Sequence, residues 1–147
     1  IDYSPPTTEI PLLYSDSDLL VVAKPAELLS VPGRRPEHQD SLLTRLQQQQ
    51  PEVLIVHRLD MSTSGLLVLA RNRDTHRHLS RQFELRQVKK TYLAVVDGEV
   101  KPPSGNIDLP LICDWPNRPR QIVDHSQGKP ALLNTTYKTT NLYTKTA

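Results

Sequence analysis

Two apolar runs enclose a short polar connection, and this arrangement constrains the fold more than any other feature of the sequence. Residues 53–56 and 66–70 have the length and the apolar content of buried strands. The connection between them carries Asp60 and closes with small hydroxyl residues and Gly65. Asp60 therefore lies in a loop between two buried strands, where it serves either as a turn former or as a reactive carboxylate.

The periodicity of apolar residues also predicts helices. A first helix follows Asp40 or Ser41, either of which can cap it, and ends by Pro51. A second helix follows a cap at Asn72 and runs over residues 73–87, with apolar side chains four residues apart on one side.

Short strands separated by prolines and glycines account for most of the remaining chain. Strand-like segments are found at residues 19–23, 90–96, 107–112, 121–123 and 133–143. Strands do not alternate with helices, so we expect an α+β fold with a mixed, largely antiparallel sheet and flanking helices. The length of 147 residues predicts a single domain.

Composition excludes several classes of protein. No apolar run approaches the roughly 18 residues of a membrane-spanning helix, and we expect a cytoplasmic protein with no membrane partner. The single cysteine, Cys113, has no partner for a disulfide within the chain. There is no glycine-rich phosphate loop, nucleophile elbow or zinc-binding motif, so the sequence predicts neither a cofactor nor a metal.

Positive charge is concentrated in one segment. Residues 71–90 hold seven basic and two acidic residues, a net charge of +5, while the rest of the chain carries −3. Arg73, Arg77 and Arg81 are spaced by four and share one face of the predicted helix. This face is either an ordinary solvated surface or one that follows a phosphate backbone.

An aromatic residue lies among arginines in a proline-rich loop. Trp115 precedes Arg118 and Arg120, and tryptophan beside arginine is typical of surfaces that stack on bases and pair with phosphates. The alternative is that Trp115 is a core residue, as most large aromatic side chains are.

The residues around Asp60 are consistent with a turn-forming role and with a catalytic role. Ser62, Ser64 and Gly65 favour turns, and an aspartate organises such turns by accepting hydrogen bonds from backbone amides. A carboxylate at the end of a buried strand is also rigidly held and partly desolvated, which suits a nucleophile. Arg58 lies two residues earlier, and its guanidinium would keep the carboxylate ionised.

Three motifs resemble a known family in the same order along the chain. The segment His-Arg-Leu-Asp at 57–60, followed by Thr-Ser-Gly at 63–65, is similar to the HRLDxxTSG signature of the RluA family of pseudouridine synthases. Lys24-Pro25 and the KxY pattern at 90–92 resemble two further motifs of that family. Residues 28–34 and 108–119 resemble a subgroup that modifies both ribosomal and transfer RNA, and the whole resemblance covers roughly residues 15–131.

The resemblance implies a fold, a reaction and a set of roles. It implies a pseudouridine synthase catalytic domain, without a cofactor or metal, acting as a monomer on uridines in a 23S rRNA hairpin and in a tRNA anticodon stem-loop. Asp60 matches the catalytic aspartate, Tyr92 the tyrosine that packs against the flipped uracil, and Arg58 the arginine that fills the gap left by the base. The residues expected to contact RNA or substrate are Arg58, Lys24, Arg73, Arg77, Arg81, Trp115 and Arg118.

One motif of the family is not found. A later GRxHQxR-type segment, whose arginine pairs with the catalytic aspartate, does not occur in the 147 residues. We therefore expect a catalytic domain truncated at its C-terminus, with no S4-type domain before it. Two rival hypotheses remain, which are a non-catalytic RNA-binding module of the same fold and an aspartate-dependent hydrolase of small molecules.

Overall fold

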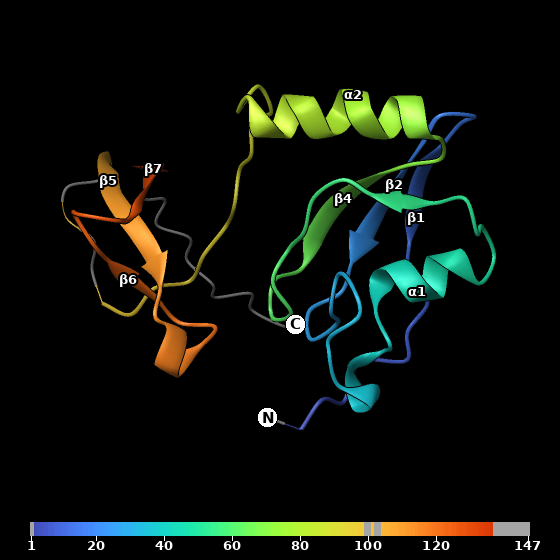
Figure 1. Ribbon diagram of the computed structural model, residues 1–147, viewed down its shortest axis with the longest axis horizontal. Coiled ribbons are helices and arrows are strands. Elements are labelled where there is room, and N and C mark those ends of the chain that lie inside the picture. The colour runs from blue at the N-terminus through green and yellow to red at the C-terminus, as the bar shows by residue number, and fades with distance from the viewer. Residues whose placement is uncertain (1, 99–100, 102–103, 137–147) are drawn as a thin grey trace, which may run out of the picture. The chain divides into compact units, whose positions relative to one another are not determined.

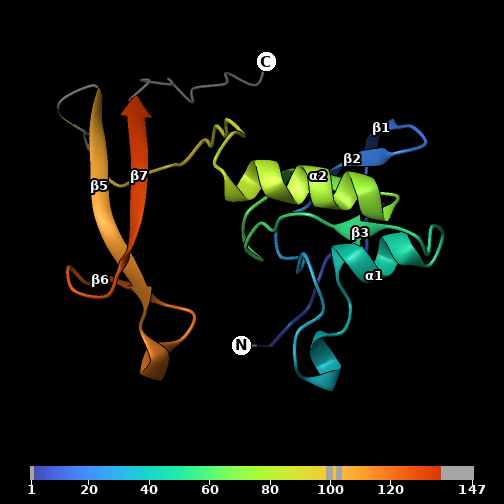
Figure 2. The same cartoon turned by 45° about the horizontal axis from the view of Figure 1, so that its top comes forward.

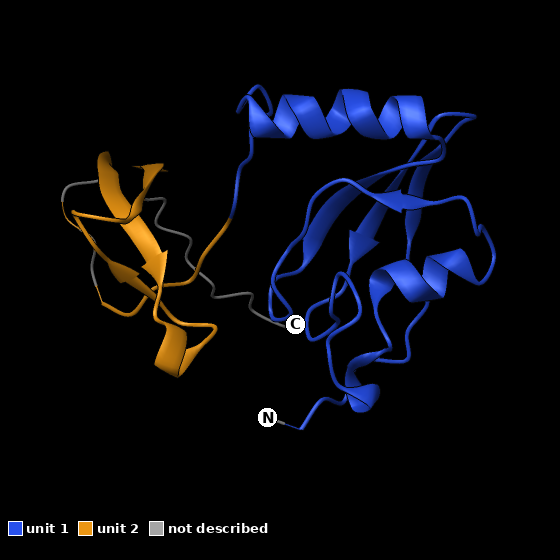
Figure 3. Cartoon of the chain, in the orientation of Figure 1, with its two compact units in different colours: residues 1–92 blue, residues 93–147 orange. Residues whose placement is uncertain are grey.

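The computed structural model describes residues 2–98, 101 and 104–136. The chain forms two compact units, residues 1–92 and 93–147 (Figure 3). The first unit combines helices with strands, and the described part of the second consists of strands, turns and a short 3-10 helix (Figure 1). The prediction of an α+β fold with a mixed, largely antiparallel sheet is confirmed in its class, and the described strands form two sheets in which every pair is antiparallel.

The first unit is built on a four-stranded sheet. Its spatial order is β1 (Leu12–Ser15), β2 (Leu19–Lys24), β4 (Gly65–Ala70) and β3 (Leu54–Ile55), and every neighbouring pair is antiparallel. The strands predicted on either side of Asp60 are both present, although β3 is shorter than predicted. Since β3 pairs only with the last two residues of β4, the chain leaves the sheet well before Asp60.

Side-chain caps determine where the helices begin. α1 (Leu42–Gln47) starts after Ser41, whose side chain accepts the amide hydrogen of Thr44 in a capping box. α2 (Arg73–Glu84) starts after Asn72, whose side chain accepts a backbone hydrogen bond in the first turn, and it runs alongside β3 and β4 (Figure 2). No helix among the described residues is long and apolar enough to cross a membrane.

α2 ends earlier than the sequence predicts. The predicted end was residue 87, whereas the helix stops at Glu84. Arg86 has a φ of 55°, a left-handed conformation that ends a right-handed helix. The amide of Arg86 donates to the carbonyl of Phe83 at 3.1 Å, which closes the final turn.

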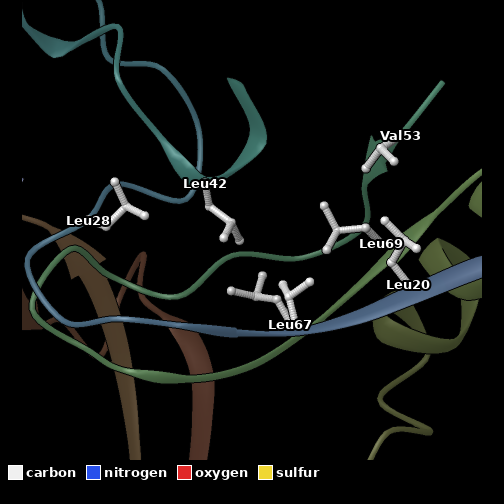
Figure 4. Packing of buried hydrophobic residues seen from close by; sticks show 7 residues of the cluster. Leu20, Leu28, Leu42, Val53, Leu67 and Leu69 are labelled. Atoms are coloured by element: carbon white, nitrogen blue, oxygen red, sulfur yellow. The ribbon is translucent and has the colours of Figure 1, made fainter. Parts of the chain in front are cut away.

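The core of the first unit lies on one face of the sheet. Alternate residues of β2 and of β4 point to this face, because successive side chains of a strand point to opposite sides. α1 and the loops beside it cover the face with further apolar side chains (Figure 4). The buried residues of this cluster are Leu20, Val22, Leu28, Leu42, Val53, Leu67 and Leu69.

The second unit contains a three-stranded antiparallel sheet within residues 104–136. Its order is β6 (Gln121–Val123), β5 (Ser104–Cys113) and β7 (Lys129–Thr136). A short 3-10 helix, Trp115–Asn117, lies in the connection between β5 and β6. The predicted strand over 133–143 corresponds in part to β7, and residues 137–143 lie outside the described residues.

The predicted strand over residues 90–96 is wrong. This segment has no regular secondary structure, and the side chain of Leu93 is 94% exposed. Its apolar and β-branched residues have a high strand propensity, but that propensity acts only where a neighbouring strand supplies hydrogen bonds and packing. None of the described strands pairs with this segment.

Adjacent leucines of β4 provide a test of the assigned core. Leu67 is fully buried and Leu66, the next residue, is 63% exposed. We expect Leu67→Ala to lower the free energy of unfolding by about 2–5 kcal/mol, because it removes buried methyl groups and leaves a cavity. Leu66→Ala should change it by about 0.5 kcal/mol or less. Urea unfolding of both variants measures the difference, and similar losses would contradict the assignment.

Candidate active site

Asp60 is the first residue of a tight turn in the loop between β3 and β4. Its carbonyl accepts the amide hydrogen of Thr63 at 3.1 Å. Gly65, where β4 begins, has a φ of +142°, a conformation that L side chains rarely adopt. The turn interpretation of this segment therefore agrees with the structure.

Asp60 was expected to be partly desolvated, as a residue at the end of a buried strand. In the structure it is exposed. The reason is the early end of β3 at Ile55, which leaves Asp60 on a loop. Arg58 is also exposed, and no ion pair joins it to Asp60 in the part of the chain that the structure describes. The position of Asp60 is thus determined by its backbone and not by partners of its carboxylate.

A buried lysine holds the backbone just after Asp60. Lys24 is 1% exposed, and its ammonium donates to the carbonyl oxygens of Pro25 at 2.9 Å, Leu28 at 2.6 Å and Met61 at 3.1 Å. An ammonium has three hydrogens, and all of them are used in these bonds. Lys24 therefore has no donor left for RNA, and its expected role as an RNA contact is replaced by a structural one.

Burial lowers the pKa of Lys24 from its ordinary value, because a desolvated ammonium is less stable than a hydrated one. The negative charges of Glu27 and Asp60 act in the opposite direction and favour the charged form. Lys24 and Asp60 are therefore close enough to interact electrostatically, although no direct bond joins their side chains. The ammonium contributes positive potential beneath the loop that carries the candidate nucleophile.

A buried serine holds the backbone just before Asp60. Ser30 is 4% exposed, and its hydroxyl donates to the carbonyl oxygen of Leu59 at 2.6 Å. The same hydroxyl oxygen accepts the amide hydrogen of Leu59 at 3.1 Å. Together with the Lys24 bond to Met61, these contacts fix the residues on both sides of Asp60.

His57 connects the start of this loop to β4 and to α2. Its Nε2 atom accepts the amide hydrogen of Val68 at 3.1 Å, so Nε2 carries no proton. Its ring stacks on Phe83 of α2, with the ring centroids 4.3 Å apart and the planes at 17°. Burial, and to a lesser extent the positive charge of Lys90, lowers the pKa of His57. His57 is therefore held as a neutral hydrogen-bond acceptor.

The predicted pocket residue Tyr92 is exposed. Its ring is 57% exposed and makes no hydrogen bond to another described residue. It lies in the segment without regular structure that follows α2. The role of Tyr92 therefore remains a prediction.

The predicted basic face of α2 is present and open to solvent. Arg73, Arg77 and Arg81 are all exposed, as their spacing predicts for one side of a helix. Arg77 forms an ion pair with Asp74, and such exposed pairs contribute little to stability. Arg77 and Arg81 also line a shallow depression together with His76, Ser80 and other residues of the helix.

Trp115 is a surface residue, and the core alternative does not hold. Its side chain is 64% exposed, and the guanidinium carbon of Arg118 lies 4.2 Å from the centre of its ring. The Nε–H of Arg118 also donates to the carbonyl oxygen of Trp115 at 3.1 Å. The pair forms an exposed stack of an aromatic ring and a guanidinium, a surface to which a base or a phosphate can bind.

Ser30 lies in the segment 28–34 and His57 in the motif at 57–60, but the sequence predicts no role for either side chain. Ser30 stands alone between leucine and valine, and an isolated hydroxyl in an apolar stretch is a weak sign of a buried polar contact. His57 gives no comparable sign. Within the described residues, no group of three or more histidine, cysteine, aspartate and glutamate side chains is arranged to hold a metal ion.

Comparison with known protein families identifies relatives of the chain. Residues 18–141 match the family described as RNA pseudouridylate synthase. The chain is 56% identical over 134 residues to a Vibrio vulnificus (strain CMCP6) protein named dual-specificity RNA pseudouridine synthase RluA, a match that covers 89% of this chain and 53% of that protein. The protein of the same name from Escherichia coli (strain K12) is 52% identical over 131 residues, covering 88% of this chain and 60% of its own length.

A solved structure shows the same fold. Human RNA Pseudouridylate Synthase Domain Containing 1 aligns with a TM-score of 0.66 at 27% sequence identity, and the alignment covers 89% of this chain and 54% of the human chain. The chain spans 53% to 60% of the length of the two bacterial proteins that it matches.

The neutral state of His57 predicts how stability depends on pH. The unfolded chain takes up a proton at this residue near pH 6.5, whereas the folded protein resists protonation to a lower pH. The unfolded state then binds more protons, so the free energy of unfolding should fall as the pH drops from about 6.5 to the lowered pKa of His57. His57→Gln should make this fall shallower, as measured by urea unfolding across the pH range.

The matched control is His78→Gln, which removes an exposed histidine from α2. It should leave the pH dependence close to that of the unmodified protein. Parallel stability curves for the unmodified protein and His57→Gln would contradict the assignment.

Proposed function

Because the chain belongs to the RNA pseudouridylate synthase family, we propose that it is the Asp60-containing part of an enzyme that isomerises uridine to pseudouridine in RNA. The observation that carries this proposal is the loop of Asp60, which combines the family signature with a backbone held on both sides by buried side chains. A nucleophile needs an accessible side chain on a rigid support, and Asp60 has both.

In the proposed reaction, Asp60 attacks the target nucleoside. A bond forms between the carboxylate and C1′ of the ribose as the glycosidic C–N bond breaks, the uracil rotates, and C5 of the base then bonds to C1′ while the carboxylate leaves. The proton on C5 leaves, and the nitrogen that left the sugar takes up a proton, so the product is an isomer of the substrate. We assign the packing against uracil to Tyr92, in accordance with the motif that it matches.

The target base must leave its stack to reach Asp60. Extracting a base costs a few kcal/mol, which contacts to the RNA have to offset. Arg58 is exposed two residues before Asp60, where an inserted guanidinium can occupy the space of the extracted base. We propose the two substrates that the motif resemblance implies, a 23S rRNA hairpin and a tRNA anticodon stem-loop. The two bacterial relatives are named dual-specificity RNA pseudouridine synthases, which agrees with two kinds of RNA substrate.

We assign RNA binding beyond the target base to two exposed surfaces. The first is the face of α2 with Arg73, Arg77 and Arg81, whose spacing suits successive phosphates. The second is the stack of Trp115 and Arg118, where an unpaired base can extend the stack. Support comes from the exposure of all five side chains.

Asp60 provides the direct test of the proposed reaction. In the full-length protein, Asp60→Asn is expected to retain RNA affinity and to form no pseudouridine, because the carboxylate nucleophile is lost while the loop backbone is kept. Release of tritium from RNA labelled at C5 of its uridines measures turnover, and RNA binding is measured separately. An exposed aspartate of α2 supplies the control Asp74→Asn, which should remain active.

Two other outcomes decide between the hypotheses. Turnover by Asp60→Asn at the rate of the unmodified enzyme would overturn the assigned nucleophile. RNA binding without product by the unmodified full-length protein would favour a non-catalytic RNA-binding module of the same fold.

If the arginine face of α2 binds RNA, it should contribute to the salt dependence of RNA affinity. Replacing Arg73, Arg77 and Arg81 together with glutamine should weaken binding of a stem-loop RNA and flatten the plot of log affinity against log salt concentration. Each lost phosphate contact reduces the magnitude of the slope by roughly 0.7 to 0.9, so a change of about 2 to 3 is expected for three contacts. Fluorescence anisotropy of labelled RNA measures the slope.

The control for this experiment is Lys129→Gln, which removes an exposed charge from β7. It should change the slope by less than the triple variant does. An unchanged slope in the triple variant would show that this face does not contact RNA.

A further inference from the structure

We propose that Ser30 is a positioning residue for the reaction, one that holds Asp60 in its reactive place through the backbone of Leu59. This inference rests on the proposed function, because it concerns the same nucleophile. Ser30 does not touch the carboxylate of Asp60 in the described structure, and it has no role in the chemical steps above.

The geometry of the contact is that of a two-point clamp. The Ser30 hydroxyl donates to the carbonyl oxygen of Leu59 at 2.6 Å, and its oxygen accepts the amide hydrogen of Leu59 at 3.1 Å. One hydroxyl thus satisfies both backbone groups of the residue that precedes Asp60, across a separation of 29 residues in the sequence. Two hydrogen bonds to Leu59 fix the orientation of its backbone as well as its distance from Ser30.

Ser30 is itself fixed by the helix that covers the core. Its carbonyl oxygen accepts the amide hydrogen of Leu43 at 3.2 Å, and the carbonyl of Leu29 accepts that of Leu42 at 2.8 Å. Both amides belong to the first turn of α1, where backbone donors have no partner within the helix. The clamp therefore links Asp60 to a rigid element and not to another loop.

The clamp matters because, among the described residues, no other side chain forms a hydrogen bond with the backbone of the residue directly before Asp60. Its carboxylate is exposed, and it accepts no hydrogen bond from another side chain in the described residues. Met61, on the other side, is held by Lys24 through a single bond at 3.1 Å. The direction in which the carboxylate leaves the loop is thus set largely by the peptide that Ser30 holds.

The chain offers a second buried serine as a matched control. Ser41 is fully buried and caps α1 by accepting the amide hydrogen of Thr44 at 3.2 Å. Replacing it with alanine removes a hydrogen bond to the backbone, as replacing Ser30 does, but the hydroxyl of Ser41 bonds only to Thr44 among the described residues and to no residue of the Asp60 loop. Comparison of the two variants separates loss of stability from loss of positioning.

The experiment uses the full-length protein with Ser30→Ala, Ser30→Thr and Ser41→Ala, at a temperature where circular dichroism shows all of them folded. Ser30→Ala is expected to lower kcat by roughly 10- to 100-fold with little change in KM for RNA, since a displaced nucleophile impairs the reaction more than binding. Ser30→Thr keeps the hydroxyl and should recover most of the loss. Ser41→Ala should keep kcat within about threefold of the unmodified enzyme.

A second measurement follows the clamp without turnover. Hydrogen exchange should be faster at the Leu59 amide in Ser30→Ala than in the unmodified protein, because that amide loses its acceptor. The exchange of amides in β2 should remain as in the unmodified protein.

Failure of this inference is distinguishable from failure of the proposed function. If the unmodified enzyme is active and Asp60→Asn is not, a normal kcat in Ser30→Ala overturns the positioning role alone. Equal losses of kcat in Ser30→Ala and Ser41→Ala, or a Ser30→Thr variant as slow as Ser30→Ala, also overturn it. An inactive unmodified enzyme overturns both proposals.

Discussion

The buried ammonium of Lys24 is the interaction on which the rest of the first unit depends. It joins the end of β2, the loop that follows and the turn after Asp60 through three backbone carbonyls. A charge removed from water without such partners would be strongly unfavourable, and the three carbonyl dipoles offset much of that cost. Lys24 thereby makes the sheet, the covering loop and the candidate active site parts of one structure.

The candidate site separates rigidity from accessibility. Residues next to Asp60 are bound by buried groups, whereas the carboxylate itself faces solvent. A nucleophile held by its own side chain would have to break those contacts to react, and a nucleophile held only by its neighbours does not. This arrangement meets, on a loop, the two requirements of the proposed nucleophile, which are a fixed backbone and an accessible carboxylate.

Elements with local signals could be predicted from the sequence. The caps Ser41 and Asn72 and the apolar runs of β2 and β4 each act over a few residues, and the structure confirms all of them. Features that depend on distant partners could not be predicted in this way. The segment 90–96 has strand propensity but no described partner strand.

In the candidate site, too, residues with a local sequence signal could be predicted and contacts between distant residues could not. Motifs identified Asp60 and also Lys24, which was expected to contact RNA or substrate, but lysine next to proline gives no sign that its charge is buried. The contact between Ser30 and Leu59 spans 29 residues and depends on how two loops meet. Such contacts follow from packing, which no local pattern encodes.

The imidazole of His57 has a consequence for association between molecules. Beyond the short pairing with β3, no described strand pairs with the outer edge of β4. At an unpaired edge an extended segment of another chain can lengthen a sheet. His57 occupies the amide of Val68, a donor that an incoming strand would need. The side chain that directs the polypeptide toward Asp60 thus also closes this part of the edge to β-augmentation by other chains.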